Sequence, residues 1–238
     1  METKVKKYTP RVERGMTKLY IPYNNKEIIF LYPAVGPQTY QEVGKEILGK
    51  GQKVPHGDFS ASLAYAAYCM PDIEREPEIQ HIRKIIKGQW LWVYNNNGWT
   101  DKGVYVVQDE KAEGRSKPLY CKDLEKRLRD GKEIDGVRFS ADGTVRFAPK
   151  ETYQLGEHTS ESFAKDGFVR ASVGSEGAEK LAEVSTKFKD NPMTWGLDIE
   201  ERQDPEMRVS VLADYGGWLG LGGGFGGGSG GCAFRVSP

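Results

Sequence analysis

Apolar and polar residues alternate in several short stretches of the chain, and this period of two predicts β-strands. The first two are KLYIPY and EIIFLYP, which the Asn-rich stretch NNK separates. Together they predict a hairpin near the start of the chain. Trp90, Trp92 and Tyr94 alternate before NNNG, and VYVVQD comes next, so we expect two further strands with NNNG as their turn.

Other stretches carry apolar residues at helical spacing. Thr39 and Glu42 form a capping-box pattern, which predicts a helix that ends at the glycines 49 and 51. In KVPHGDFSASLAYAAYC, Asp58 is the predicted cap of a second helix. Pro77 opens a third, which runs to Lys87 with isoleucines on its inner face.

The second half of the chain continues the mixture. Residues 118–130 predict a short charged helix, and GVRFSADGTVRFAP predicts a hairpin. FVRASVG predicts a strand, after which Ser175 opens a helix that ends at Asn191 and Pro192. TWGLDI, RVSVLAD, WLGL and CAFRV are four short strand candidates.

This order of elements favours an α+β fold with a mixed or antiparallel sheet and two or more packed helices. Residues 1–15 form a charged lead-in, and no proline-rich or serine-rich linker divides the rest of the chain. We therefore expect a single domain over residues 16–238.

Composition narrows the function. The chain has 238 residues, of which 38% are apolar, and 34 basic side chains balance 34 acidic ones. A neutral chain has no overall field to attract nucleic acid. Because the sequence has no apolar run long enough to span a bilayer and no apolar leader, we expect a cytoplasmic protein by default. We also expect a monomer.

The residues that most often carry chemistry are scattered. Cys69, Cys121 and Cys232 form no CxxC pattern, and their odd number argues against a disulfide framework. The three histidines have no metal-ligand spacing. We expect no catalytic residue, no metal and no cofactor.

The chain ends in WLGLGGGFGGGSGGCAFRVSP, and this glycine-rich run needs an explanation. A flexible tail is one interpretation, although the strand-like CAFRV after the glycines weakens it. A phosphate-binding GxGxxG loop is excluded because no helix can open after it. Aggregation is disfavoured because bulky side chains are few.

The genetic code offers another origin. If each position began as an AAC or AAT codon and only its adenines were replaced, Gly, Ser, Asp, Tyr, Phe and Leu could arise, whereas Lys, Glu, Gln, Met, Trp and stop codons could not. Apart from scaffold residues, everything from Asp214 to Gly231 belongs to the reachable set. The run is consistent with a mutated series of asparagines.

The pattern RVSVLAD, a tryptophan, a variable stretch and CAFRVSP resembles the ending of variable proteins of archaeal diversity-generating retroelements. In that family a reverse transcriptase rewrites the end of the gene with errors at adenines. The resemblance implies a C-type lectin fold of the formylglycine-generating-enzyme branch. KVPHGDFSASLAYAAY is similar to the helix that follows an R-L-P-T element in that branch, with Val54 and Pro55 matching the element and His56 departing from it.

The resemblance implies a ligand-binding protein whose diversified region covers about residues 208–238. Its partner would be a protein or another macromolecule. The implied contact positions are Asp214, Tyr215, Gly216, Gly217, Gly220, Gly222, Gly223, Gly224, Phe225, Gly226, Gly227, Gly228, Ser229, Gly230 and Gly231. Tyr215 and Phe225 would be the main anchors.

Alternation predicts how the variable residues are oriented. We expect Leu219 and Leu221 to point into the core and Gly220 and Gly222 to face outward. Trp218, whose codon is not reachable, is expected to be a core anchor.

Two other functions on the same fold stay open. One is an oxidoreductase of the formylglycine-generating kind, which uses paired cysteines where this chain has only Cys232. The other is a calcium-dependent sugar binder, although its E-P-N and W-N-D motifs are absent from the sequence.

Overall fold

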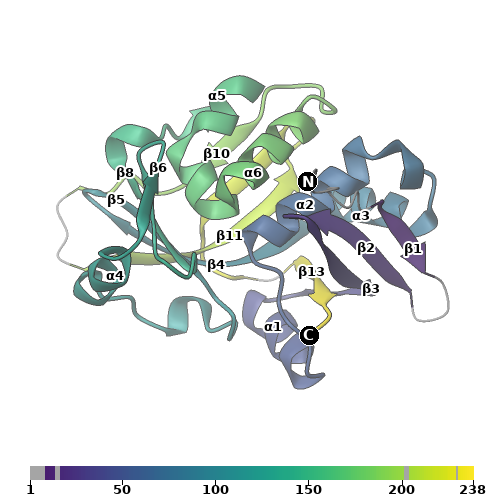
Figure 1. The fold of residues 1–238 in the computed structure, drawn as a ribbon, viewed down its shortest axis with the longest axis horizontal. Coiled ribbons are helices and arrows are strands. Elements are labelled where there is room, and N and C mark those ends of the chain that lie inside the picture. The colour runs from purple at the N-terminus through teal and green to yellow at the C-terminus, as the bar shows by residue number, and fades with distance from the viewer. Residues whose placement is uncertain (1–8, 14–16, 201–203, 229) are drawn as a thin grey trace, which may run out of the picture.

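The structure is a computed structural model that describes residues 9–13, 17–200, 204–228 and 230–238 (Figure 1). Most of the expected lead-in, residues 1–8 and 14–15, lies outside the described residues. The first half contains β1 (Arg11–Glu13), β2 (Lys18–Tyr23), β3 (Lys26–Gln38), α1 (Tyr40–Gly49), α2 (Gly57–Cys69), α3 (Pro77–Gly88), β4 (Trp90–Thr100) and β5 (Gly103–Gln108).

The second half contains α4 (Cys121–Leu128), β6 (Lys132–Ile134), β7 (Val137–Phe139), β8 (Val145–Pro149), β9 (Gly156–Glu157), α5 (Ser160–Lys165), α6 (Gly167–Ser185), β10 (Met193–Trp195), β11 (Glu206–Asp214), β12 (Leu219–Phe225) and β13 (Gly231–Val236). Short 3-10 turns lie at Pro71–Ile73, Gly114–Ser116 and Lys150–Thr152. We refer to the second of these as η2.

The strands form one mixed sheet. Its main order is β1-β2-β3-β13-β4-β11-β12-β10-β9, and β5, β8, β7 and β6 extend from β4. Two pairings are parallel, β13 with β4 and β10 with β12, while the other pairings are antiparallel. The expected α+β class with a mixed sheet and packed helices is confirmed.

Apolar clusters lie on both faces of this sheet. Along β4, Leu91 and Val93 belong to the large cluster that packs under α2, α3 and α6, whereas Trp92 and Tyr94 belong to the cluster under α1. Figure 1 shows α6 and α1 on opposite sides of the central strands. The alternation seen in the sequence thus places one face of β4 in each cluster.

Several predicted elements are confirmed. The first hairpin forms with the register Lys18↔Leu31 to Tyr23↔Lys26. Helix α1 has its capping box, with Thr39 and Glu42 each accepting from the other's backbone N–H. The isoleucines of α3 are buried, and the turn of the later hairpin lies between β7 and β8, as expected.

The stretch NNNG is not a turn, which corrects the prediction. It continues β4, and the chain reverses at Asp101 and Lys102 instead. Asn95, Asn96 and Asn97 are all at most 2% exposed. Their amides donate to buried backbone oxygens of other elements, so tertiary hydrogen bonds override the turn preference of asparagine.

The stretch FVRASVG is not a strand but the first part of α6. Gly174, with φ of 74°, kinks the helix between two halves. Carbonyl oxygens beside such a kink lose helical partners. Here Arg146 Nη1 donates to the oxygen of Ala171 at 3.2 Å, and Asn95 Nδ2 donates to that of Ser172 at 2.8 Å.

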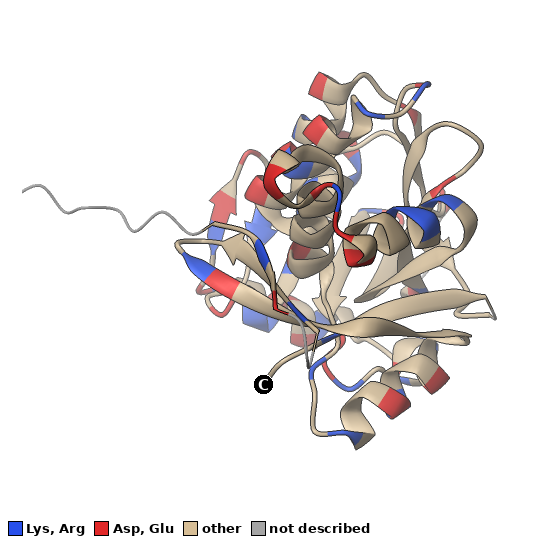
Figure 2. Ribbon diagram, turned by 90° about the vertical axis from the view of Figure 1, so that its right-hand side faces the viewer, with Lys and Arg blue, Asp and Glu red and all other residues tan. Residues whose placement is uncertain are grey.

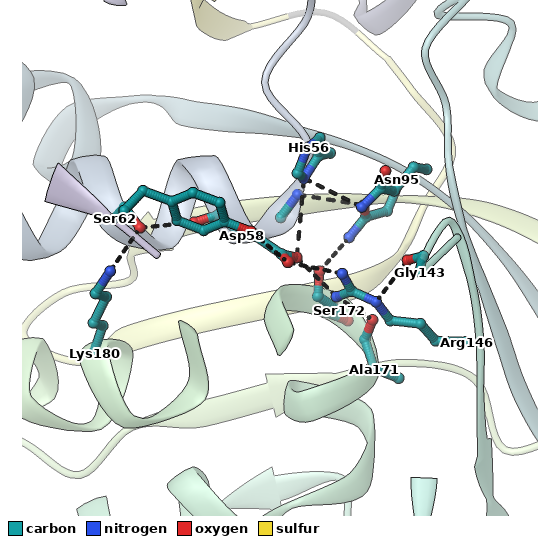
Figure 3. Close-up of polar contacts among 12 residues, drawn as sticks. His56, Asp58, Ser62, Asn95, Gly143, Arg146, Ala171, Ser172 and Lys180 are labelled. Carbon is teal, nitrogen blue, oxygen red and sulfur yellow. Dashed lines mark hydrogen bonds and ion pairs between the residues drawn. The ribbon is translucent and has the colours of Figure 1, made fainter. Parts of the chain in front are cut away.

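Asp58 does not cap α2, whose N-cap residue is His56. The Asp58 carboxylate pairs with the Arg146 guanidinium at 2.8 Å (Figure 3). The side chain of Asp58 is 14% exposed and that of Arg146 is 7% exposed. Burial would raise the pKa of Asp58, but the adjacent guanidinium outweighs burial and lowers that pKa below its ordinary value. This pair links α2 to β8 and, through Ala171, to α6.

We predict that Arg146→Ala lowers the free energy of unfolding by about 3–5 kcal/mol, because it leaves the Asp58 carboxylate buried without a counter-charge. Urea denaturation measures this change. Lys150→Ala is the control, since its pair with Asp198 is exposed and should contribute no more than about 1 kcal/mol. Equal losses in the two variants would contradict the assignment.

Candidate functional site

The residues expected from the sequence to vary, called the variable residues below, lie in the sheet and in two turns beside it. Asp214 ends β11, and Tyr215 to Gly217 lie in the connection to β12. The glycines from 220 to 224 are within β12, and residues 226–230 connect β12 to β13. Ser229 lies outside the described residues. The segment is therefore integrated into the fold, and a detached tail is excluded for its described part.

The backbone of the glycine strand is paired along both edges. Strand β12 pairs antiparallel with β11, as in Leu212↔Leu221, and parallel with β10, as in Thr194↔Leu221. These pairings use main-chain groups, which every residue except proline provides. The strand is held without any contribution from glycine side chains.

Two side chains of β4, which lie outside the variable positions, bind the main chain of this strand. Trp99 Nε1 donates to the carbonyl oxygen of Gly223 at 2.8 Å, and Asn97 Nδ2 donates to the same oxygen at 3.1 Å. Trp99 and Asn97 are both fully buried. These donors would be left without partners if β12 moved away, at a penalty of about 1–3 kcal/mol for each buried group.

Leu219 and Leu221 are buried in the core, as expected. Gly220 lies on the other side of the strand but is also buried, which corrects the expectation that it faces outward. A Cβ there would meet Trp195 Cζ3 at 2.2 Å and Tyr215 Cδ2 at 2.8 Å. Aromatic rings occupy the space that the missing side chain leaves.

Trp218 is not a core anchor, which also corrects the prediction. It is half-buried and stacks on Tyr215, with ring centroids 5.7 Å apart, and on Trp195 at 5.0 Å. The reason is alternation, since Trp218 precedes Leu219 and lies on the side opposite to that leucine. Trp195 and Tyr215 cover Gly220, and Trp218 packs against both of these rings.

Phe225 plays a similar part at the other end of β12. A Cβ on Gly222 would lie 2.3 Å from the Phe225 ring, and that ring packs edge-on against Trp90 with centroids 4.9 Å apart. Gly222 is therefore buried, contrary to expectation. Position 225 is one of those expected to vary, so the fit at Gly222 depends on the side chain there as well as on Val211, whose Cγ2 atom lies 3.1 Å from an added Cβ.

Gly223 and Gly231 are covered by residues of the fixed part of the chain. A Cβ on Gly223 would lie 2.4 Å from Phe168, and one on Gly231 would lie 2.2 Å from Trp92. Both rings are fully buried. A larger residue at either position would have to displace a core aromatic.

Other variable positions are open. Nothing lies within 4 Å of a Cβ added to Gly216, Gly228 or Gly230. Gly216 and Gly230 have φ of +88° and +104°, which L side chains rarely adopt. Gly228 has no such restriction and is exposed. Four of the variable glycines thus form a covered set (Gly220, Gly222, Gly223 and Gly231). Four exposed ones form an open set (Gly216, Gly226, Gly228 and Gly230), in which Gly226 alone has a neighbour near an added Cβ, Arg115 Nη1 at 3.2 Å.

A small polar pocket lies beside the open loop. Its volume is about 250 Å³, and Tyr40, Gln41, Gly114, Arg115, Ser116, Val209, Gly226 and Gly227 line it. The backbone N–H of Tyr40 donates to the oxygen of Gly227 at 3.3 Å. This contact joins the variable loop to the start of α1.

A larger cavity of about 590 Å³ lies away from the variable loop, between the first hairpin and the start of α2. Tyr23, Val54, His56, Phe59 and Val236 are among its lining residues. The His56 ring lies against Phe59, with centroids 3.8 Å apart. Sequence reasoning missed this cavity because its walls come from four separate segments.

Cys232, the cysteine of the terminal motif, is buried and hydrogen-bonds through Sγ to Gln89 Oε1 at 2.8 Å. Burial raises the pKa of this thiol to about 11. It is therefore protonated at neutral pH, and a protonated thiol is a poor nucleophile. All three cysteines are free.

Within the described ranges, no group of three or more His, Cys, Asp or Glu side chains could hold a metal ion. The helices of that same part of the chain include none with the length and apolar character needed to cross a membrane.

We predict that Gly223→Ala lowers the free energy of unfolding by about 1–3 kcal/mol, because its methyl group collides with Phe168. Gly228→Ala is the matched control in the same variable segment. It should be neutral or stabilise the protein by up to about 1 kcal/mol, since it only restricts the unfolded chain. Thermal denaturation of both variants gives the comparison. Similar losses in the two variants would show that burial of a glycine under an aromatic ring does not determine whether a larger residue is tolerated there.

We predict a loss of stability in mild acid from His56. Burial lowers its pKa from 6.5 to about 4, so the folded protein binds this proton less readily than the unfolded chain does. The contribution of neutral His56 to the free energy of unfolding is fully present above about pH 6.5. It declines by up to roughly 1.4 kcal/mol per pH unit towards pH 4. His56→Gln should have a smaller slope in urea titrations over this window, and an unchanged slope would refute the assignment.

No model of a protein family matches the chain, and no curated protein is significantly similar to it in sequence. The chain is similar to a solved structure described as "Accommodation of massive sequence variation in Nanoarchaeota by the C-type lectin fold". The two are 14% identical with a TM-score of 0.48, and the match covers 86% of this chain and 97% of that chain.

Proposed function

We propose that the chain is a ligand-binding protein that displays a diversified surface on a C-type lectin-like scaffold. The observation that carries the proposal is the way the glycine strand is held. Its main chain is paired by β10 and β11 and is fixed at Gly223 by Trp99 and Asn97. A scaffold of this kind tolerates exchange of exposed side chains because few of its contacts depend on them.

The proposed contact surface is the open set together with the flanking aromatics. Gly226, Gly228 and Gly230 are exposed in the connection between β12 and β13. Tyr215 and Phe225 are half-buried and flank β12 at either end. Loops on a rigid framework with aromatic residues beside small ones are typical of binding surfaces.

A protein partner suits this surface better than nucleic acid does. Blue and red segments are interspersed along the ribbon in Figure 2, in keeping with equal numbers of basic and acidic side chains. Such a surface provides no broad positive field for a phosphate backbone. We therefore propose a protein or a similar macromolecule as the ligand.

Binding is also favoured over oxidoreductase chemistry. An enzyme of the formylglycine-generating kind relies on reactive paired cysteines, whereas Cys232 is buried with a raised pKa. We propose that the chain works without a catalytic residue or a cofactor.

Two display libraries of the full chain test the proposal. One randomises Gly226 and Gly228, the two positions of the open set without a left-handed φ, and the matched library randomises Gly223 and Gly231 of the covered set, both with the residues that adenine replacement in an Asn codon allows. We expect most members of the open library to stay protease-resistant and to yield specific binders from a panel of purified proteins. The covered library should lose stability by about 1–3 kcal/mol per overpacked position.

Two results would contradict the proposal. One is an open library that is folded but yields no specific binder, and the other is equal protease resistance in the two libraries.

The DNA beside the gene tests diversification separately. We expect a near-copy of the final coding stretch next to a reverse transcriptase gene, with adenines where the codons of the variable positions have changed. Mismatches at positions other than adenine would count against this origin of the glycine run.

A further inference from the structure

The short turn η2 presents its residues rigidly beside the variable loop. The buried carboxylate of Asp109 accepts from the N–H of Glu113 at 3.1 Å and from that of Gly114 at 2.6 Å. Asn96 Nδ2 donates to the oxygen of Gly114 at 2.7 Å. Arg115 is the next residue, so its backbone is held in place by buried polar groups.

The guanidinium of Arg115 is available to a ligand. The residue is exposed, and we find no hydrogen-bond or ion-pair partner for its guanidinium within the described residues. The nearest acidic side chain along the chain, that of Glu113, pairs with Lys117 at 3.2 Å. Gln41 Nε2 is occupied by the oxygens of Glu113 and Ser116.

We propose that Arg115 is a fixed anchor for a carboxylate side chain of a protein partner, seated in the 250 Å³ pocket beside the variable loop. This inference rests on the proposed function and names the chemistry of part of the ligand. Arg115 lies outside the variable positions, so every variant of the surface retains this anchor.

The charge of the pocket selects a carboxylate over a phosphate group. Arg115 is the cationic residue among those that line the pocket, and Tyr40, Gln41 and Ser116 are neutral. One guanidinium matches the single charge and the two oxygens of a carboxylate, which it can bind in a bidentate manner. A doubly charged phosphate would need further positive groups.

The variable residue at position 226 controls access to this anchor. A Cβ on Gly226 would lie 3.2 Å from Arg115 Nη1. Glycine leaves the guanidinium open. An aspartate, the acidic residue that adenine replacement allows here, would pair with Arg115 and occupy the pocket. One variable position thereby switches a constant binding group on or off.

Nuclear magnetic resonance of the full chain tests this with acetate as the probe. We expect saturable shifts of the Gly226 and Gly227 amides and of the Arg115 side-chain N–H, in the millimolar range. Acetamide, which has the same shape without the charge, should produce none of them. Arg115→Gln should weaken acetate binding roughly tenfold, the loss expected for a hydrogen bond to a charged group.

The role of position 226 is tested by two matched substitutions in the same loop. Gly226→Asp should abolish the acetate shifts, whereas Gly228→Asp, with the same charge in the same loop, should leave them largely intact. Equal effects of the two substitutions, or an acetate affinity that Arg115→Gln leaves unchanged, would overturn the inference. Tighter binding of inorganic phosphate than of acetate at these residues would overturn the choice of a carboxylate.

These results are independent of the library experiment. If the open library yields no binder while acetate still binds at Arg115, the proposed function fails and the anion site stands. If the library yields binders that ignore Arg115→Gln, the proposed function stands and the anchor fails.

Discussion

Main-chain pairing of the glycine strand is the interaction on which the rest of the structure depends. Strand β12 lies between β11 and β10, and fixed donors on β4 reach its carbonyl oxygen at Gly223. Glycine loses more backbone entropy on folding than other residues. The strand is ordered because the hydrogen bonds and the buried leucines at 219 and 221 offset that loss.

Aromatic rings that pack over four glycines limit which side chains can replace them. At Gly223 and Gly231 the covering rings, Phe168 and Trp92, belong to the fixed core, so a change there is opposed by close packing. At Gly222 the covering ring is Phe225, and the Cγ2 atom of Val211 lies 3.1 Å from an added Cβ, so a change at position 225 removes the closest contact and leaves the one with Val211. The variable segment is thus a set of positions with different tolerances, and some of them are coupled.

Much of the fold could be predicted from local signals. The capping box at Thr39 and the isoleucine spacing of α3 act within one element, and both predictions are confirmed. The predictions for Asn95 to Asn97 and for the stretch FVRASVG are wrong because long-range hydrogen bonds set both structures. The three asparagines of β4 donate to α6, η2 and β12, and Arg146 of β8 donates to α6 at its kink. The glycine run and the residue types expected of variable positions are visible in the sequence. Which of its glycines are covered is not, because Trp195, Phe168 and Trp92 come from distant segments.

The place of β13 has a consequence for how variants are made. This strand comes after the variable loop in the chain, yet it lies in the interior of the sheet between β3 and β4 and contributes Phe234 to the large cluster. A product whose reading frame shifts within the glycine-rich segment would lack this strand and leave β3 and β4 with unpaired edges. Closure of the sheet therefore requires that the segment be read in frame to its end.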